Sequence, residues 1–156
     1  MSGIESRLKS LGYELPEVVP PVAAYVPAVR AGTMVFTSGQ LPMKAGQLTC
    51  TGIVGADTTP EDAKAAAQLC ALNAIAAVKS VLGNLDNVRR VVKVVGFVAS
   101  APDFTGQPGV INGASEFLLE VFGESGKHAR SAVGVAALPL NASVEVEIIV
   151  EVDHMA

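Results

Sequence analysis

A strict alternation of side chains near the C-terminus restricts the fold of this chain more than any other stretch. From residue 144 to 152, valine or isoleucine stands at every even position, and glutamate fills the odd positions except for Ile149. Successive side chains of a β-strand point to opposite faces of its sheet, so this segment predicts a strand with one apolar and one mostly acidic face. Other elements of the chain must therefore cover the apolar face.

The segment before it alternates as well and predicts a second strand. Val133 and Val135 share a face with Ser131, and the opposite face carries Arg130 followed by alanine, glycine and alanine at 132, 134 and 136. These side chains are small enough to let another surface approach closely. The five-residue connection 138–142 predicts that the two strands form an antiparallel hairpin, although its length leaves the register open.

Two helices and an apolar strand are predicted in the middle of the chain. Thr59 can cap a helix whose first turn has Pro60 and two acids, and apolar residues recur at helical spacing from there to Gly83. Residues 89–100 are almost continuously apolar, which is typical of a central strand covered on both faces. The segment 108–122 predicts the second helix.

A first hairpin and a loop are predicted ahead of these helices. The hairpin has strands at 22–29 and 33–38, and the glycine-rich stretch 41–57 is interpreted as a loop with one short strand at 47–51. The order of elements favours an α+β fold with a single mixed β-sheet and two helices on one face. Residues 1–156 are expected to form one domain.

The first twenty residues are interpreted as an N-terminal arm. A short helix is predicted at 4–11, and Pro16, Pro20 and Pro21 favour an extended stretch after it. The start of the chain lacks the basic stretch and apolar run of a secretory signal. A cytoplasmic location is therefore expected.

Composition narrows the classes of function. Half of the 156 residues are hydrophobic, and a mean hydropathy of +0.44 is high for a soluble monomer. No apolar run approaches the roughly 18 residues of a membrane helix, so the surplus of apolar side chains predicts a subunit interface. The net charge of −4 disfavours nucleic-acid binding.

Cys50 and Cys70 lack the spacing of a metal cluster or redox pair, and Cys70 is predicted to be a buried thiol.

Three segments resemble, in order, signature segments of one known family. They are 23–32 with its tyrosine, 35–42 with its Ser-Gly-Gln sequence, and 129–147 with Ala-Arg-Ser, Leu-Pro and Val-Glu-Val-Glu. Together they are similar to the Rid family of enamine and imine deaminases, also called the YjgF or endoribonuclease L-PSP family, over about residues 21–152. The resemblance implies a chorismate mutase-like fold whose sheets pack into a homotrimer, with sites in the clefts between subunits.

The resemblance also implies roles for individual residues. Arg130 would hold the substrate carboxylate with its planar guanidinium, and Glu145 would position or activate a water molecule. Tyr25, Ser38 and Asn112 match pocket positions of the family and are predicted to bind substrate, although Asn112 could be only a structural cap. The implied reaction is the hydrolysis of a 2-aminoacrylate-type enamine or imine to a 2-keto acid and ammonia, without a metal or cofactor.

The residues by themselves leave plainer interpretations open. Arg130 could be a strand-end arginine paired with Glu145 or Glu147, and Glu145 could be a solvated strand residue. His128 and His154 are interpreted as plain surface residues.

Departures from the family pattern leave the natural substrate open. Ala132 stands where the family often has a cysteine, and Val26 and Pro27 replace a Ser-Gln pair after Tyr25. Two other classes of function are considered. A non-catalytic, regulatory trimer would keep Arg130 as a carboxylate clamp, and an endoribonuclease would need a basic groove that this acidic chain hardly offers.

Overall fold

The computed structural model describes residues 3–18 and 22–154. Its elements are α1 (Gly3–Ser10), β1 (Ala28–Ala31), β2 (Met34–Thr37), β3 (Met43–Lys44), β4 (Gln47–Leu48), α2 (Pro60–Leu82), β5 (Val88–Ala99), α3 (Gln107–Phe122), β6 (Ala129–Val135) and β7 (Val144–Val152). Short 3-10 helices lie at Leu85–Asn87, Gly123–Gly126 and Pro139–Asn141. The helix predicted at 4–11 is confirmed as α1, whereas Pro20 and Pro21 lie outside the described residues.

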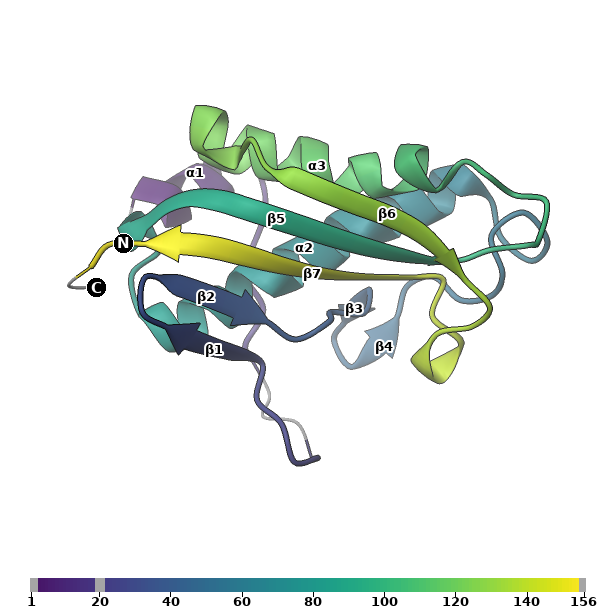
Figure 1. The fold of residues 1–156 in the computed structure, drawn as a ribbon, viewed down its shortest axis with the longest axis horizontal. Coiled ribbons are helices and arrows are strands. Elements are labelled where there is room, and N and C mark those ends of the chain that lie inside the picture. The colour runs from purple at the N-terminus through teal and green to yellow at the C-terminus, as the bar shows by residue number, and fades with distance from the viewer. Residues whose placement is uncertain (1–2, 19–21, 155–156) are drawn as a thin grey trace.

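The main sheet has five strands in the order β1-β2-β7-β5-β6, and α2 and α3 cover one of its faces (Figure 1). β5 and β6 are parallel, whereas the other neighbours in this sheet are antiparallel. The even-numbered side chains of β7 are buried and join the core formed with both helices, as their alternation predicts. The predicted α+β fold with a mixed sheet and both helices on one face is confirmed.

β6 and β7 do not form the predicted hairpin. Each pairs with β5 instead, β6 in parallel along one edge and β7 antiparallel along the other. Because β5 is almost continuously apolar, its backbone groups are satisfied best with a neighbouring strand on both edges. α3 supplies the crossover that the parallel β5–β6 pair requires. The connection 136–143 then leads from β6 on one edge of β5 to β7 on the other edge.

The first hairpin starts later than predicted. Strand β1 begins at Ala28, the residues 22–27 are not strand, and the turn falls at Gly32. Pro27 has no N–H group to donate to a ladder, which limits extension of the strand toward the N-terminus. Gly32 adopts a φ of 62°, a conformation that glycine tolerates without steric cost. The loop 41–57 contains the two-stranded sheet β3–β4 rather than a single strand.

Helix α2 has the two ends that the sequence predicts. Thr59 Oγ1 accepts a hydrogen bond from the Asp62 N–H at 3.1 Å, and Gly83 ends the helix with a φ of 80°. By length and composition α2 could cross a membrane, so the expectation that no apolar run approaches the length of a membrane helix is wrong. However, 61% of its most apolar 18-residue window is buried inside the fold. Cys70 is a buried thiol, as predicted, and burial raises its pKa well above the usual range. We interpret α2 as a core helix.

The face of the sheet opposite the helices carries exposed apolar side chains. Val29 on β1, Phe36 on β2 and Val133 on β6 are 52%, 42% and 44% exposed. Val29 pairs with Phe36, and Val133 pairs with Phe97 on β5. We call this surface the open face. Val29 and Phe36 lie near one edge of this face and Val133 near the other, and the glutamates of β7 lie between them. Exposed apolar side chains on one face of a sheet are expected to pack against another protein surface.

The small residues of β6 face α3 of the same chain, which is the surface that approaches them closely. Ala132 and Gly134 pair with Gly96 and Val98 of β5, whose positions are buried under the helices. A Cβ atom on Gly134 would lie 2.8 Å from Nε2 of Gln107, at the start of α3. The small side chains therefore make room for α3 of the same chain, and the close approach of a second subunit is not expected on this face.

Candidate functional site

Arg130 lies on the edge strand β6, half-buried on the face that α3 covers. Its Nη1 donates one hydrogen bond to Oδ1 of Asn112 at 2.7 Å and another to Oγ of Ser115 at 3.3 Å. Asn112 and Ser115 are three positions apart on α3, so they face the strand from the same side of the helix. The cap position of α3 is Gly106, which rules out the interpretation of Asn112 as a helix cap.

Arg130 has no carboxylate partner in the part of the chain that the structure describes. None of the ion pairs there includes it, so the plainer interpretation that it pairs with Glu145 or Glu147 is wrong. Both of its hydrogen bonds start from Nη1, which leaves the Nε and Nη2 groups without an acceptor among the described residues. These two nitrogens form an edge that fits a carboxylate bidentately.

Ser115 also contacts His128, which precedes Arg130 by two residues. Nδ1 of His128 lies 2.6 Å from the carbonyl oxygen of Gly126, and Nε2 lies 2.8 Å from Oγ of Ser115. A carbonyl oxygen only accepts, so Nδ1 carries a proton, and Nε2 of the neutral ring then accepts from the Ser115 hydroxyl. The interpretation of His128 as a plain surface residue is therefore wrong, whereas His154 is exposed as predicted.

The side chain of Glu145 lies on the face of the sheet opposite the helices. It lies at the start of β7 between Val144 and Val146, which are both buried on the helix side. Its carboxyl group packs directly on Gly39, where a Cβ atom would overlap Oε2 of Glu145, so a larger residue at position 39 would require the Glu145 side chain to shift. Burial raises the pKa of Glu145, and the negative charge of Glu147 raises it further. A raised pKa brings the proton exchange of a carboxyl group closer to neutral pH, which favours general acid or base catalysis.

Tyr25 and Ser38 lie on the chain segments next to Gly39. Ser38 donates its hydroxyl to the carbonyl oxygen of Val26 at 2.6 Å and its N–H to that of Pro27 at 2.8 Å. These bonds tie the segment that contains Tyr25 to the end of β2. Tyr25 itself is 58% exposed. Ser38 thus positions the segment that contains Tyr25, and its hydroxyl proton is engaged in the hydrogen bond to Val26.

The predicted site residues fall into two groups in one copy of the chain. The arginine cluster consists of Asn112, Ser115, His128 and Arg130, and the glutamate cluster consists of Tyr25, Ser38, Gly39 and Glu145. Arg130 pairs with Val94 and Glu145 with Phe97, three positions along β5, so the two side chains leave opposite faces. Strand spacings place their Cα atoms roughly 14 Å apart. The predicted hairpin would have brought the two strands side by side, whereas β5 lies between them and keeps Arg130 and Glu145 of one copy apart.

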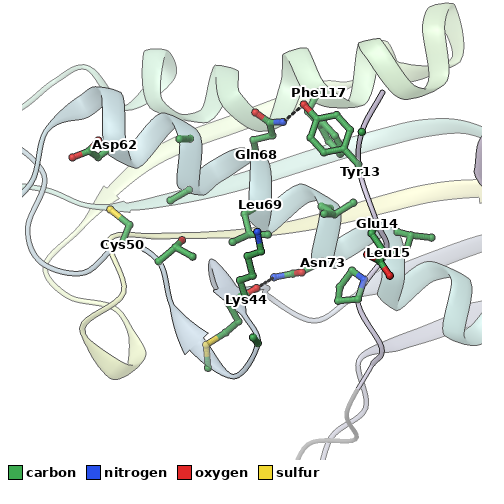
Figure 2. Close-up of a pocket in the computed structure, with 18 of the residues that line it drawn as sticks. Tyr13, Glu14, Leu15, Lys44, Cys50, Asp62, Gln68, Leu69, Asn73 and Phe117 are labelled. Atoms are coloured by element: carbon green, nitrogen blue, oxygen red, sulfur yellow. Dashed lines mark hydrogen bonds between the residues drawn. The ribbon is translucent and has the colours of Figure 1, made fainter. Parts of the chain in front are cut away.

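A cavity of about 1210 Å³ lies in a different part of the molecule (Figure 2). Residues 12–17, α2, β3 and the segment 49–51 line it, together with Phe117 of α3. Asn73 in its wall donates from Nδ2 to the carbonyl oxygens of Leu41 and Met43 at 3.1 and 3.0 Å, and so fastens the small sheet to α2. None of the predicted site residues borders this cavity, so it is separate from both clusters.

Ser115 and His128 were missed as site residues on the basis of sequence. A signal was present, because Ser115 follows Asn112 by three positions in a helix, and His128 precedes Arg130 by two positions at the start of a strand. Within residues 3–18 and 22–154, no group of three or more His, Cys, Asp or Glu side chains is placed to hold a metal ion.

Comparison with known proteins identifies the family. The profile of the family described as "YjgF/chorismate_mutase-like, putative endoribonuclease" matches residues 5–152. Protein TCP17 of Trypanosoma cruzi is 45% identical over 152 residues, which are 97% of this chain and 95% of TCP17. The crystal structure of protein Atu1372 of Agrobacterium tumefaciens, of unknown function, is similar with a TM-score of 0.90 and 52% identity, over 96% of this chain and 93% of that one.

A more distant structure carries a ligand. TdcF of E. coli, solved with bound serine, is 25% identical with a TM-score of 0.62, over 86% of this chain and 92% of that one. The profile match covers nearly the whole chain, and the relatives match it along most of their own lengths. The chain therefore belongs to the YjgF family, also called the Rid family.

Proposed function

We propose that this protein hydrolyses small enamines or imines of the 2-aminoacrylate type to 2-keto acids and ammonia, with Arg130 holding the substrate carboxylate. The observation that carries the proposal is the partly buried Arg130 side chain, whose hydrogen bonds among the described residues go to the neutral groups of Asn112 and Ser115. The Nε and Nη2 edge of its guanidinium is therefore open to a carboxylate, which an arginine can bind bidentately. The relative TdcF binds serine, a molecule that also bears a carboxylate.

The second reactive group is Glu145, which we assign to a neighbouring copy of the chain. Arg130 and Glu145 of one copy leave opposite faces of the sheet, so one copy does not form a complete site. A second copy that packs its open face near the β6 edge would bring its glutamate cluster toward Arg130. The site would then lie between subunits.

The reaction would use these two groups. A bound enamine first takes up a proton from solvent at its terminal carbon and becomes an iminium ion. Glu145 removes a proton from water while the water oxygen bonds to the iminium carbon, and the C=N π electrons move to nitrogen, which gives a carbinolamine. Glu145 then passes this proton to the amino nitrogen, the C–N bond breaks and ammonia leaves, while electrons of the O–H bond form the keto group and the hydroxyl proton returns to solvent through Glu145. These steps use no metal or cofactor.

Purified protein should accelerate the decay of 2-aminoacrylate, because the site would bind its carboxylate and activate water. The substrate is generated in place from serine by a pyridoxal-phosphate dehydratase, and ammonia and pyruvate are measured against time. The rate should rise in proportion to protein concentration. A protein that binds 2-oxobutyrate but leaves the decay at the rate in buffer would instead be the non-catalytic, carboxylate-binding trimer.

We also propose that three copies associate through the open face. Phe36→Glu should dissociate the homotrimer, because an unpaired carboxylate in an apolar interface costs several kcal/mol to desolvate. Sedimentation velocity at micromolar concentration measures the change. The matched control is Val81→Glu on α2, since Val81 is 39% exposed on a helix whereas Phe36 is 42% exposed on the open face. A parent protein that sediments as a monomer would refute the proposed assembly.

A further inference from the structure

We propose that Ser115 and His128, together with Asn112, form a neutral brace that fixes the direction of the Arg130 guanidinium and preserves its charge for a ligand. The inference rests on the proposed carboxylate site and adds two positioning residues to it. Neither Ser115 nor His128 touches the bound carboxylate in this arrangement, because both act through the guanidinium.

The brace occupies one corner of the guanidinium. Nη1 carries two protons, of which one points to Oδ1 of Asn112 and the other to Oγ of Ser115. Because the guanidinium is planar, two contacts at one nitrogen fix the plane of the whole group. The edge formed by Nε and Nη2 is then held in one direction before any ligand arrives, which lowers the entropy lost on binding.

His128 determines which way the Ser115 hydroxyl points. The carbonyl oxygen of Gly126 holds the ring proton on Nδ1, so Nε2 of the neutral ring takes the hydroxyl proton of Ser115. Ser115 can then offer only lone pairs to Arg130, which is the role that a guanidinium donor needs. Without His128 the hydroxyl would rotate, and its proton would face Arg130 part of the time.

The brace carries no negative charge. Its partners for Arg130 are an amide and a hydroxyl, and no ion pair among the described residues includes Arg130. Aspartate at position 112 would supply a carboxylate of nearly the same shape and would compete with the ligand. Asn112→Asp should therefore keep the contact with Arg130 but weaken binding of 2-oxobutyrate by about tenfold or more.

Two pairs of variants test the brace against simple packing. Ser115→Ala should weaken 2-oxobutyrate binding about five- to tenfold, whereas Ser115→Thr should retain it, since one net hydrogen bond is at stake. His128→Asn should behave like Ser115→Ala, whereas His128→Gln should restore binding, because its side-chain oxygen reaches the place of Nε2. Ser80→Ala is the control, since among the described residues the Ser80 hydroxyl bonds only to the carbonyl oxygen of Ala77 in its own helix.

Two measurements distinguish a failure of the brace from a failure of the proposed carboxylate site. Titration calorimetry gives the affinity for 2-oxobutyrate, and the NMR order parameter of the Arg130 Nε–H in the free protein reports how firmly the guanidinium is held. No binding by the parent would refute the carboxylate site, while the free-protein signal would still test the brace. The brace would be overturned if the order parameter of the Arg130 Nε–H stayed unchanged in Ser115→Ala and His128→Asn. It would also be overturned if His128→Asn and His128→Gln lost equal affinity for 2-oxobutyrate.

Discussion

Replacing Arg130 with lysine should leave the fold intact and remove most carboxylate binding and enamine hydrolysis. Lysine keeps the positive charge but offers a compact ammonium in place of a planar fork, so it cannot contact α3 and grip a carboxylate bidentately at the same time. Each charge-assisted hydrogen bond contributes about 1.5 to 3 kcal/mol. The affinity for 2-oxobutyrate should therefore fall about 10- to 100-fold, as measured by titration calorimetry beside a thermal melt.

Arg90→Lys is the matched control for this change. Arg90 is also a strand arginine, but it is exposed and its Nε contacts Oε2 of Glu151 at 2.9 Å. Exposed ion pairs of this kind contribute little to stability, and the control should bind 2-oxobutyrate like the parent. If Arg130→Lys also binds like the parent, a single point charge is sufficient and the bidentate clamp is refuted.

Replacing Glu145 with glutamine should lower turnover about 10²- to 10⁴-fold, the range typical of a positioned general acid or base. Glutamine has nearly the same shape but cannot take a proton from water. The affinity for 2-oxobutyrate should change little, since an interaction used mainly in the transition state affects rate more than ground-state binding. Steady-state rates of 2-aminoacrylate decay and calorimetry on the same sample separate the two effects.

The raised pKa of Glu145 adds a dependence on pH. Its ionised form would be the base, so activity should rise with pH through a value above the ordinary 4.5, and Glu145→Gln should lose this limb. Stability changes in the opposite sense. Because folding raises the pKa, ionisation of Glu145 destabilises the folded state as pH rises through that value. Glu145→Gln should thus melt higher than the parent at pH 8, and this difference should vanish near pH 4.

Glu151→Gln is the control for Glu145, because it removes a carboxylate from the same strand at an ion pair with Arg90. Its turnover and acid limb should match those of the parent. A Glu145→Gln enzyme with unchanged turnover would show that another group handles the water. If Arg130→Lys alone loses binding and the parent accelerates no enamine decay, the protein is a carboxylate-binding module.

Local sequence signals predicted most of the elements correctly. The cap at Thr59, the stop at Gly83 and the alternation of β7 each depend on neighbouring residues, so that they can be found without knowledge of the fold. Strand pairing could not be predicted in this way. β5 pairs with β6 on one edge and with β7 on the other, so β6 and β7 are not neighbours. No short-range sequence pattern predicts which strands pair in this way. The cytoplasmic location stays a prediction.

The sequence by itself determined the types of residue at the candidate site and the strand alternation that assigns each to a face. Arg130 and Glu145 were found from motif resemblance alone, because their own neighbours do not distinguish them from ordinary strand residues. Only the tertiary structure showed that Arg130 has neutral partners on α3 and that Glu145 packs on Gly39. Strand β5 lies between β6 and β7 and so separates the two residues, and such long-range pairing is decided by packing of the whole sheet.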